Sequence, residues 1–272
     1  MKSGNHQKRN TNKNKRLSFG GTMGMIKIWP LVMISLFLIG SMEVIVTVEG
    51  EESDVSSSLT EFTRNSSTTG LMNSTFPMFK GDPQRTGRCN VDTSDNPGII
   101  KWTFPTDSPS ESTPVIDING TIYFGTHTGY FYAVYPNGSE KWNFYTGQHI
   151  YASGVLDSYG HIYFPCVDGY FYCLYTSNGT LRWRIPRGVG EGGPVIYNDT
   201  IYHYGVGGFC AIDLEGNLLW INSSYNFYRS CPAVGHDGIL YIGSYDNYLQ
   251  AVYPNNGTLK WEFETGYYVS TT

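Results

Sequence analysis

The chain repeats one pattern of hydrophobic and polar residues about every 40 positions. Residues 113–147, TPVIDINGTIYFGTHTGYFYAVYPNGSEKWNFYTG, hold four short runs of aromatic and β-branched residues, and related stretches begin near Ala152, Gly193 and Cys231. Tryptophans keep the register at intervals of 40, 41, 37 and 41 residues: Trp102, Trp142, Trp183, Trp220 and Trp261. A constant period of this length is typical of a repeat architecture.

Each repeat predicts four short β-strands. In the first repeat the expected strands are 113–117, 121–127, 130–136 and 140–146. Turn sequences such as Asn119-Gly120 and Asn137-Gly138 separate them, as in β-hairpins. Four strands in about 40 residues predict a β-propeller blade, and a blade must stack on its neighbours because it cannot bury both faces alone. A tryptophan, which buries roughly 150–250 Å², is suited to such a joint.

The number of repeats predicts an incomplete or open all-β propeller. Four complete repeats are preceded by a predicted strand at 99–105, which contains Trp102, and are followed by residues 266–272, which align with the opening of another repeat. An open arc leaves sheet faces exposed. We therefore expect either a fragment of a longer propeller or a ring that another chain completes.

The residues around the tryptophans resemble the docking repeat of PQQ-like (pyrroloquinoline-quinone-type) propellers. The matching sets are Ala133, Gly138, Trp142 and Gly147; Cys173, Gly179, Trp183 and Gly188; Ala211, Gly216 and Trp220; and Ala251, Gly257, Trp261 and Gly266. The stretch 77–88 resembles the lead-in of such propellers. The resemblance covers about residues 77–272. It implies that the five tryptophans, with Gly138, Gly179, Gly216 and Gly257, dock successive blades.

The resemblance is compatible with two functions. Outer-membrane assembly lipoproteins and lumenal stress-sensor domains use this fold without the quinone, whereas quinoprotein dehydrogenases bind PQQ and calcium. No calcium-binding set of carboxylates and no adjacent pair of cysteines can be assigned in the sequence. We therefore expect a non-enzymatic binding or scaffold domain without a cofactor, whose loops bind a protein or carbohydrate partner. A fragment of a PQQ-dependent dehydrogenase is the alternative.

The first 75 residues have a different composition. Residues 1–24 are predicted to form a basic disordered tail, 25–48 a signal peptide or signal-anchor helix, 49–75 a Ser/Thr-rich linker, and 76–272 the propeller repeats, truncated in the fifth blade. A basic segment before an apolar run predicts secretion or single-pass membrane attachment, with the propeller outside the cytoplasm. Cleavage and anchoring both remain open.

Charge and glycosylation sequons refine this picture. Seven of the 18 Lys and Arg residues lie in residues 1–27, so the remainder is acidic, which disfavours nucleic acid as a partner. Eight Asn-x-Ser/Thr sequons occur, and those at Asn65 and Asn73 in the linker are the better glycan candidates. The sequons at Asn119, Asn137, Asn178 and Asn256 lie in Asn-Gly turns, which explains the asparagines without a glycan.

No catalytic residue and no metal ligand is predicted. The five cysteines form no Cys-x2-Cys, and the five histidines of the repeats fall at different positions of the repeat, so small buried thiols and surface histidines are expected. A Cys166–Cys173 disulfide is less expected because the two residues are diagonal across a hairpin. Four aromatic residues of the inter-blade loops are candidates for a partner surface: Tyr151, Tyr225, Phe227 and Tyr228.

Overall fold

The structure is a computed structural model that divides into two compact units, residues 1–67 and 68–272. It describes the backbone of 22–28, 32–39 and 43–48, and both backbone and side chains of 70–74, 76–88, 94, 96–188, 191–226 and 230–269. Asn65, Cys89, Phe227 and Tyr228 lie outside the described residues. Within the described part of the chain, no helix is long and apolar enough to cross a membrane.

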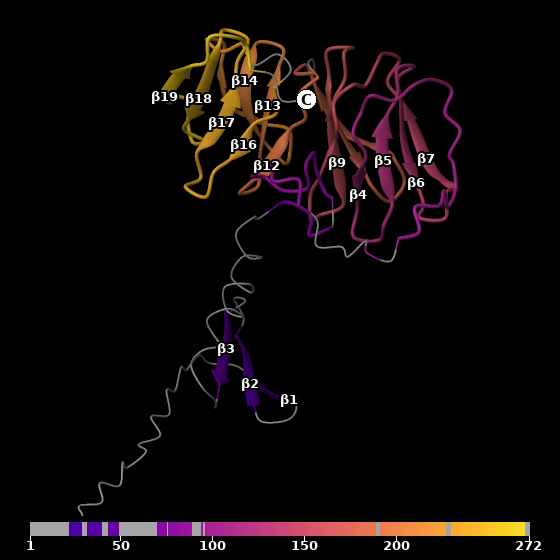
Figure 1. Cartoon of the computed structure of the whole chain (residues 1–272), viewed down its shortest axis with the longest axis vertical. Coiled ribbons are helices and arrows are strands. Elements are labelled where there is room, and N and C mark those ends of the chain that lie inside the picture. Colours follow the sequence, from indigo (N-terminus) through magenta and orange to yellow (C-terminus); the bar gives the residue numbers. More distant parts are fainter. Residues whose placement is uncertain are drawn as a thin grey trace, which may run out of the picture. The chain divides into compact units, whose positions relative to one another are not determined.

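The first unit contains one antiparallel sheet in the order β1-β2-β3 (Figure 1). Its strands are β1 (Thr22–Ile28), β2 (Val32–Ile39) and β3 (Glu43–Val48). The described stretches of this segment are extended, and the helix expected within residues 25–48 stays a prediction. The role of these residues as a signal peptide or anchor stays a prediction, as do the tail 1–24 and the linker 49–75.

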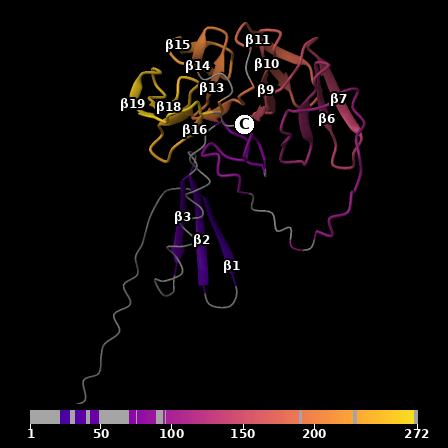
Figure 2. The same ribbon diagram turned by 45° about the horizontal axis from the view of Figure 1, so that its top comes forward.

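The described residues of the second unit form four antiparallel sheets of four strands each, which confirms the predicted all-β fold of open propeller blades (Figures 1 and 2). Blade 1 contains β4 (Val115–Ile116), β5 (Ile122–Gly125), β6 (Tyr130–Val134) and β7 (Glu140–Tyr145). Blade 2 contains β8 (Val155–Leu156), β9 (His161–Pro165), β10 (Phe171–Tyr175) and β11 (Leu181–Ile185). Blade 3 contains β12 (Val195–Tyr197), β13 (Thr200–Gly205), β14 (Gly208–Asp213) and β15 (Leu218–Asn222). Blade 4 contains β16 (Ala233–Val234), β17 (Leu240–Gly243), β18 (Tyr248–Val252) and β19 (Leu259–Glu264).

The third and fourth strands of every blade pair in the same register. The tryptophan of the fourth strand lies opposite a small residue of the third, in the pairs Ala133–Trp142, Cys173–Trp183, Ala211–Trp220 and Ala251–Trp261. Immediately after this pair the register shifts by one residue in each blade, as in a β-bulge. The small residue leaves space for the indole, which explains the alanines and the cysteine of the repeat.

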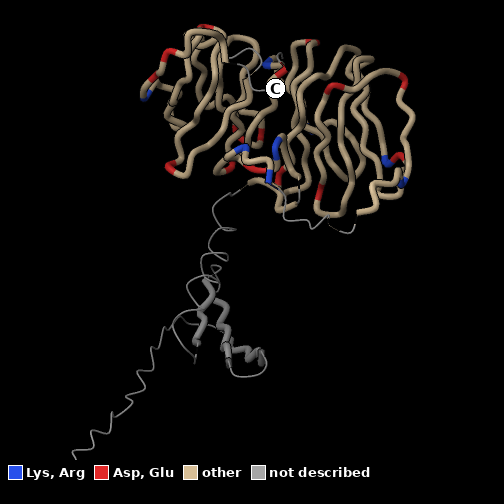
Figure 3. The backbone as a smooth tube through the Cα atoms, viewed as in Figure 1, with Lys and Arg blue, Asp and Glu red and all other residues tan. Residues whose placement is uncertain are grey.

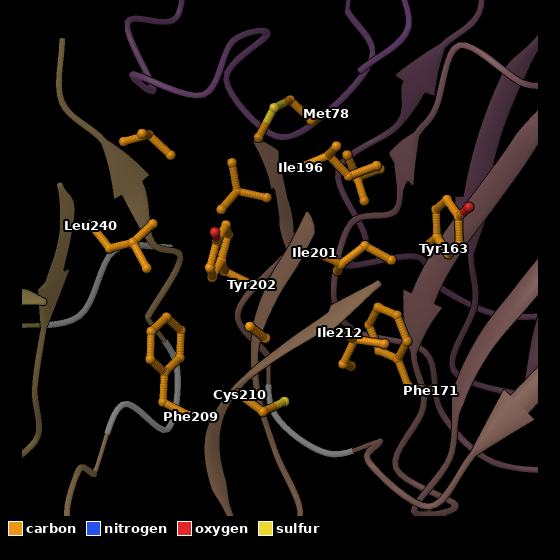
Figure 4. Packing of buried hydrophobic residues seen from close by; sticks show 14 of the residues in the cluster. Met78, Tyr163, Phe171, Ile196, Ile201, Tyr202, Phe209, Cys210, Ile212 and Leu240 are labelled. Atoms are coloured by element: carbon orange, nitrogen blue, oxygen red, sulfur yellow. The ribbon is translucent and has the colours of Figure 1, made fainter. Parts of the chain in front are cut away.

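Aromatic and aliphatic side chains fill the joints between blades. Phe131 of blade 1 stacks on Phe164 of blade 2 with ring centroids 3.9 Å apart. Around blade 3, a second cluster holds Phe171, Ile201, Phe209 and Leu240 together (Figure 4). The blades are thus joined by burial of apolar surface, which is the main favourable contribution to folding.

The lead-in segment runs along the inner strands of all four blades. The amides of Ile116, Leu156 and Val234 donate to the carbonyls of Phe76, Pro77 and Pro83 at 2.7, 2.9 and 2.7 Å. Met78 of this segment is fully buried against the core around blade 3 (Figure 4). Blades 1, 2 and 4 are therefore tied by backbone bonds to one stretch of chain, and Arg85 extends the connection to blade 3.

The prediction of a β-strand at residues 99–105 was wrong. These residues belong to none of the sheets, and no backbone hydrogen bond involves them within the part of the chain that the structure describes. Trp102 nevertheless lies against blade 1. The physical reason is that a strand is defined by its pairing, and none of the described strands pairs with these residues.

Candidate functional site

Each predicted docking tryptophan except the last lies against a glycine of the following blade. The indole nitrogens of Trp102, Trp142, Trp183 and Trp220 donate to the carbonyls of Pro136, Thr176, Leu214 and Pro254 at 2.9, 2.9, 3.1 and 2.8 Å. A Cβ atom added to Gly138, Gly179, Gly216 or Gly257 would lie 2.8, 2.6, 3.0 or 2.5 Å from the corresponding indole. These glycines also have positive φ, so both their conformation and their lack of a side chain suit the joint.

Trp261 has a different environment. It is 40% exposed, whereas the equivalent Trp142 is 8% exposed. No described glycine lies against its indole, and all six residues of β19 are exposed. Among the described residues, the face of blade 4 that carries Trp261 has no neighbouring blade, although it is equivalent to the faces by which blades 1 to 3 join the next blade.

A pocket of about 170 Å³ opens where the inner strands of the four blades begin. Its wall takes one residue from each blade at the same position of the repeat: Thr113, Ser153, Gly193 and Cys231. The lead-in segment adds Phe79, and Glu111, Tyr151 and Glu191 complete the lining. Three of the four blade residues have a small side chain with a hydroxyl or thiol group, and the fourth is a glycine. No bulky side chain from these four positions therefore fills the pocket.

Two histidines lie beside the pocket, next to Tyr151. The rings of His127 and His149 are 5.5 Å apart, and their centroids lie 5.2 and 5.3 Å from that of Tyr151. His127 Nε2 lies 3.3 Å from a carboxylate oxygen of Glu111. The sequence predicted unrelated surface histidines, but the fold brings these two together because a turn of blade 1 meets the loop that leads into blade 2.

Arg85 lies next to the pocket and binds backbone carbonyls of residues that line it. Its guanidinium donates to four carbonyls, those of Phe79, Gly193, Pro194 and Pro232, at 2.7–3.1 Å. Burial lowers the pKa of Arg85 from its usual value, while nearby Cys231 and Asp82 oppose the shift. An arginine stays protonated in proteins, so a cation is fixed between blades 3 and 4 by carbonyl dipoles.

The pocket does not fit PQQ, which is a tricarboxylate. The lining carries the carboxylates of Glu111 and Glu191, which would repel such an anion. Its volume of about 170 Å³ is also below the roughly 300–1,000 Å³ of sites for drug-sized ligands. Within the described residues, no group of three His, Cys, Asp or Glu side chains is arranged to hold a metal ion.

Two buried aspartates have a structural role. Asp117 accepts hydrogen bonds from the amides of Asn119 and Thr121 and from Tyr123 Oη, and Asp157 makes the equivalent bond with Tyr163, both tyrosine contacts at 2.7 Å. Burial and these carboxylates raise the pKa of both tyrosines. The pairs fix the first turn of blades 1 and 2, in agreement with turn chemistry as the explanation of these aspartates.

Three of the described cysteines are buried free thiols, Cys166, Cys173 and Cys210, and Cys231 is also buried. The Cys166–Cys173 disulfide is therefore absent. Burial raises the pKa of Cys166 to about 11 and those of Cys173 and Cys210 to about 12. Because the thiolate is the nucleophile, these three side chains are small apolar core residues and not reactive groups.

The other predicted surface residues divide between the pocket, the core and the solvent. Tyr151 lines the pocket, but Tyr225 is 8% exposed and packs in the core around blade 3, so its prediction as a loop surface residue was wrong. Asn73 is exposed. In the turns at Asn137, Asn178 and Asn256, the side-chain oxygen accepts from the amide two residues later. The sequence did not reveal the four blade residues of the pocket, because they share a position in the repeat but have different side-chain chemistry.

No family model matches the sequence, and no curated protein sequence matches it. Solved structures do match at low identity. They include BamB from Moraxella catarrhalis (18% identity, TM-score 0.52) and quinohemoprotein alcohol dehydrogenases from Comamonas testosteroni and Pseudomonas putida HK5 (15% identity each, TM-scores 0.59 and 0.60). The fold is that of PQQ-like β-propellers. The matches cover 60%, 75% and 71% of this chain but only 55%, 42% and 40% of the three neighbours.

Proposed function

We propose that this chain is a non-enzymatic protein-binding scaffold that acts outside the cell or in a lumen. The observation that carries the proposal is the face of blade 4 that no described residue covers. Phe131, Phe171 and Phe209 are fully buried in blades 1 to 3, whereas Leu249 at the same position of blade 4 is partly exposed. Trp261 and Phe263 on this face are 40% and 64% exposed.

A protein is a better partner for this face than a carbohydrate. The face is an antiparallel sheet with adjacent tryptophan, phenylalanine and leucine side chains, and large aromatic residues dominate the energetics of protein interfaces. Contiguous apolar surface of this kind marks interaction sites in soluble proteins. The acidic composition of the propeller, where acidic side chains outnumber Lys and Arg (Figure 3), disfavours a nucleic acid partner.

A photo-crosslinking experiment tests this surface. A benzophenone amino acid at position 263 of the full-length chain, irradiated in a secretory host, is expected to form a discrete adduct with another protein. The matched control carries the same group at position 206, a turn residue that is 45% exposed. Adducts only within the same molecule, or equal labelling at both positions, would contradict the proposal.

The cofactor alternative needs a separate measurement. Because the pocket carries two carboxylates, addition of PQQ and Ca²⁺ to the purified chain is expected to change neither its absorbance spectrum nor its melting temperature. A quinone absorbance band that survives gel filtration, or a rise in melting temperature, would favour the dehydrogenase alternative.

The extracytoplasmic location rests on the basic and apolar N-terminal segments and on the sequons. Expression of the full chain in a eukaryotic secretory host is expected to give a glycosylated product, with Asn73 as an exposed acceptor. Treatment with a glycosidase and mass spectrometry of Asn73→Gln beside the wild type would measure this. An unmodified protein that stays in the cytosol would contradict the location.

A further inference from the structure

Six of the eight Asn-x-Ser/Thr sequons lie in the propeller repeats, and the fold separates five of them from the sixth. These five are in turns that join the first strand of a blade to the second or the third strand to the fourth: Asn119, Asn137, Asn178, Asn198 and Asn256. Antiparallel pairing puts both kinds of turn at one edge of the blade, which we call the turn edge. The first strands begin at the opposite edge, where the pocket opens, and the turns between second and third strands there contain no sequon.

The asparagines of the turn edge are exposed, and three of them form the same hydrogen bonds. The side-chain oxygens of Asn137, Asn178 and Asn256 accept from the hydroxyl of the serine or threonine two residues later, at 2.7, 2.8 and 2.8 Å. Within the described part of the chain, their side-chain nitrogens form no hydrogen bond, and this nitrogen is the atom to which an N-linked glycan is attached. A glycan there would leave both bonds to the oxygen intact.

The sixth sequon has a different environment. Asn222 is the last residue of β15 and is partly buried. Its side-chain nitrogen donates to the carbonyl of Gly257 at 3.0 Å, and its oxygen accepts from the amide of Ser224 at 2.9 Å. The nitrogen of Asn222 is therefore part of the joint between blades 3 and 4, and a glycan on it would displace the turn of blade 4.

Blade 3 shows that the joint does not need a sequon. Its turn between the third and fourth strands has Glu215-Gly216-Asn217 in place of Asn-Gly-Ser or Asn-Gly-Thr. This turn still closes, because the amide of Gly216 donates to Asp213 O at 3.1 Å and Gly216 still packs on the indole of Trp183. The glycine is thus common to the four joints, whereas the asparagine and the hydroxyl of the other three turns have no counterpart in blade 3.

We propose that Asn137, Asn178 and Asn256 carry N-linked glycans, which line the turn edge of blades 1, 2 and 4, and that Asn222 stays unmodified. This inference rests on the extracytoplasmic location in the proposed function. Because N-linked glycans are bulky and polar, they would keep this edge in solvent. A protein partner would then reach the propeller from the pocket edge or at the face of blade 4.

The modification is a group transfer without oxidation or reduction. The donor is a polyprenyl-diphosphate-linked oligosaccharide, and the catalyst is the oligosaccharyltransferase of a secretory compartment. The side-chain nitrogen of the asparagine forms a bond to the anomeric carbon of the donor. The bond from this carbon to the diphosphate oxygen breaks, the nitrogen loses one proton, and polyprenyl diphosphate leaves.

Mass spectrometry of the full-length chain from a eukaryotic secretory host tests the proposal. A cleavable signal peptide of the host is placed before Met1, so that entry into the lumen does not depend on the chain's own N-terminal segment. A glycosidase that converts glycosylated asparagine to aspartate is used in heavy-oxygen water, which distinguishes glycan sites from spontaneous deamidation of the Asn-Gly sequences. Most molecules are expected to be labelled at Asn137, Asn178 and Asn256, and Asn222 is expected to be unlabelled.

Absence of label at the three turn asparagines would overturn this inference but not the proposed location, which is tested by the chain without the added signal peptide. Equal labelling of Asn222 and the three would also overturn it, because the fold would then not distinguish the sequons.

A matched pair of variants checks one site. Thr180→Ala removes the sequon but keeps Asn178, whereas Thr180→Ser keeps the hydroxyl that bonds to its side chain. The first variant is expected to lose one glycan, seen as a shift in gel mobility that glycosidase treatment abolishes, and the second is expected to keep it. Unchanged mobility of Thr180→Ala would overturn the assignment of a glycan to Asn178.

Discussion

His203 occupies a core position that corresponds to Phe124 in blade 1, Phe164 in blade 2 and Ile242 in blade 4. It is 1% exposed, its ring lies 4.8 Å from that of Phe171, and neither ring nitrogen has a hydrogen-bond partner. Burial lowers its pKa to about 3, and the carbonyl of Arg187 opposes this shift only in part. A neutral histidine is therefore enclosed where the other blades have an apolar side chain.

The folded protein should lose stability in mild acid because of this residue. The unfolded chain binds a proton at His203 near the ordinary pKa of about 6.5, whereas the folded chain does not until pH falls to about 3. The stabilisation is thus complete above about pH 6.5 and is lost as the pH falls below it. At pH 5 the loss from this group is about 2 kcal/mol relative to pH 7.

Urea unfolding of the wild type and of His203→Phe at pH 7 and pH 5 measures this loss. The variant is expected to have a free energy of unfolding that changes by about 2 kcal/mol less between the two pH values than that of the wild type. His236→Gln is the control, because His236 is exposed. Equal pH dependence in the wild type and His203→Phe would show that His203 is protonated in the folded state.

At the scale of the element, a single glycine can decide whether two blades join. Gly179 has φ of +73°, and a Cβ atom there would lie 2.6 Å from the indole of Trp142. Gly169 has φ of +93° but has nothing within 4 Å of an added Cβ atom. Both positions therefore carry the cost of a left-handed backbone, and only Gly179 carries a steric clash as well.

We expect Gly179→Ala to destabilise the protein by about 2–4 kcal/mol and Gly169→Ala by about 1 kcal/mol, because only the first displaces a docked tryptophan. Chemical denaturation gives both values, and a change in the near-ultraviolet circular dichroism of the tryptophans reports the displacement of Trp142. Similar losses in the two variants would mean that the joint tolerates a methyl group.

The tryptophans themselves give a second comparison between elements. Trp142→Ala is expected to lower the free energy of unfolding by about 3–5 kcal/mol. The substitution creates a cavity between blades 1 and 2 and removes the hydrogen-bond donor to the carbonyl of Thr176. Trp261→Ala is expected to lower it by about 1 kcal/mol, because this indole is 40% exposed. An equal loss at both positions, measured by denaturant titration, would show that the face of blade 4 is covered in solution.

The sequence predicted these elements well because their pattern is local. The runs around Tyr123 and Phe131 show the spacing of strands, and the Asn-Gly turns place their ends within a few residues. The segment 99–105 shows the same local pattern and yet is not part of a sheet, because pairing depends on a neighbour that the sequence pattern does not supply. The pocket was not predictable from residue chemistry, since Thr113, Ser153, Gly193 and Cys231 have in common only their place in the repeat.

At the scale of the whole molecule, the lead-in segment holds the arc of blades together from inside. Its backbone forms hydrogen bonds with the inner strands of blades 1, 2 and 4, and the bond between Val234 and Pro83 joins residues that are more than 100 positions apart in sequence. Arg85 adds bonds to Gly193 and Pro194 of blade 3 and to Pro232 of blade 4. The sequence did not reveal this role, because the acceptors are backbone carbonyls and carry no residue-specific pattern.

Loss of the guanidinium should therefore weaken the whole arc. Arg85→Met keeps much of the apolar stem but leaves the carbonyls without their donors, and we expect a loss of about 3 kcal/mol in the free energy of unfolding. For a domain of this size that corresponds to a fall of about 6–12 °C in melting temperature. Arg85→Lys should recover little, since an ammonium group cannot reach acceptors on two blades with a planar fork.

The control is Arg88→Met, because Arg88 is exposed and its backbone amide, not its guanidinium, forms the hydrogen bond seen with another described residue, Thr86. Calorimetry gives the melting temperatures, and hydrogen exchange locates the effect. If Arg85 couples blades 3 and 4 through the lead-in, the amide of Val234, which donates to Pro83 O, should exchange faster in Arg85→Met than in the control. The amide of Ile116, which donates to Phe76 O in blade 1, should be less affected. Uniform acceleration at both amides would mean that the arginine stabilises the fold as a whole and does not join these two blades specifically.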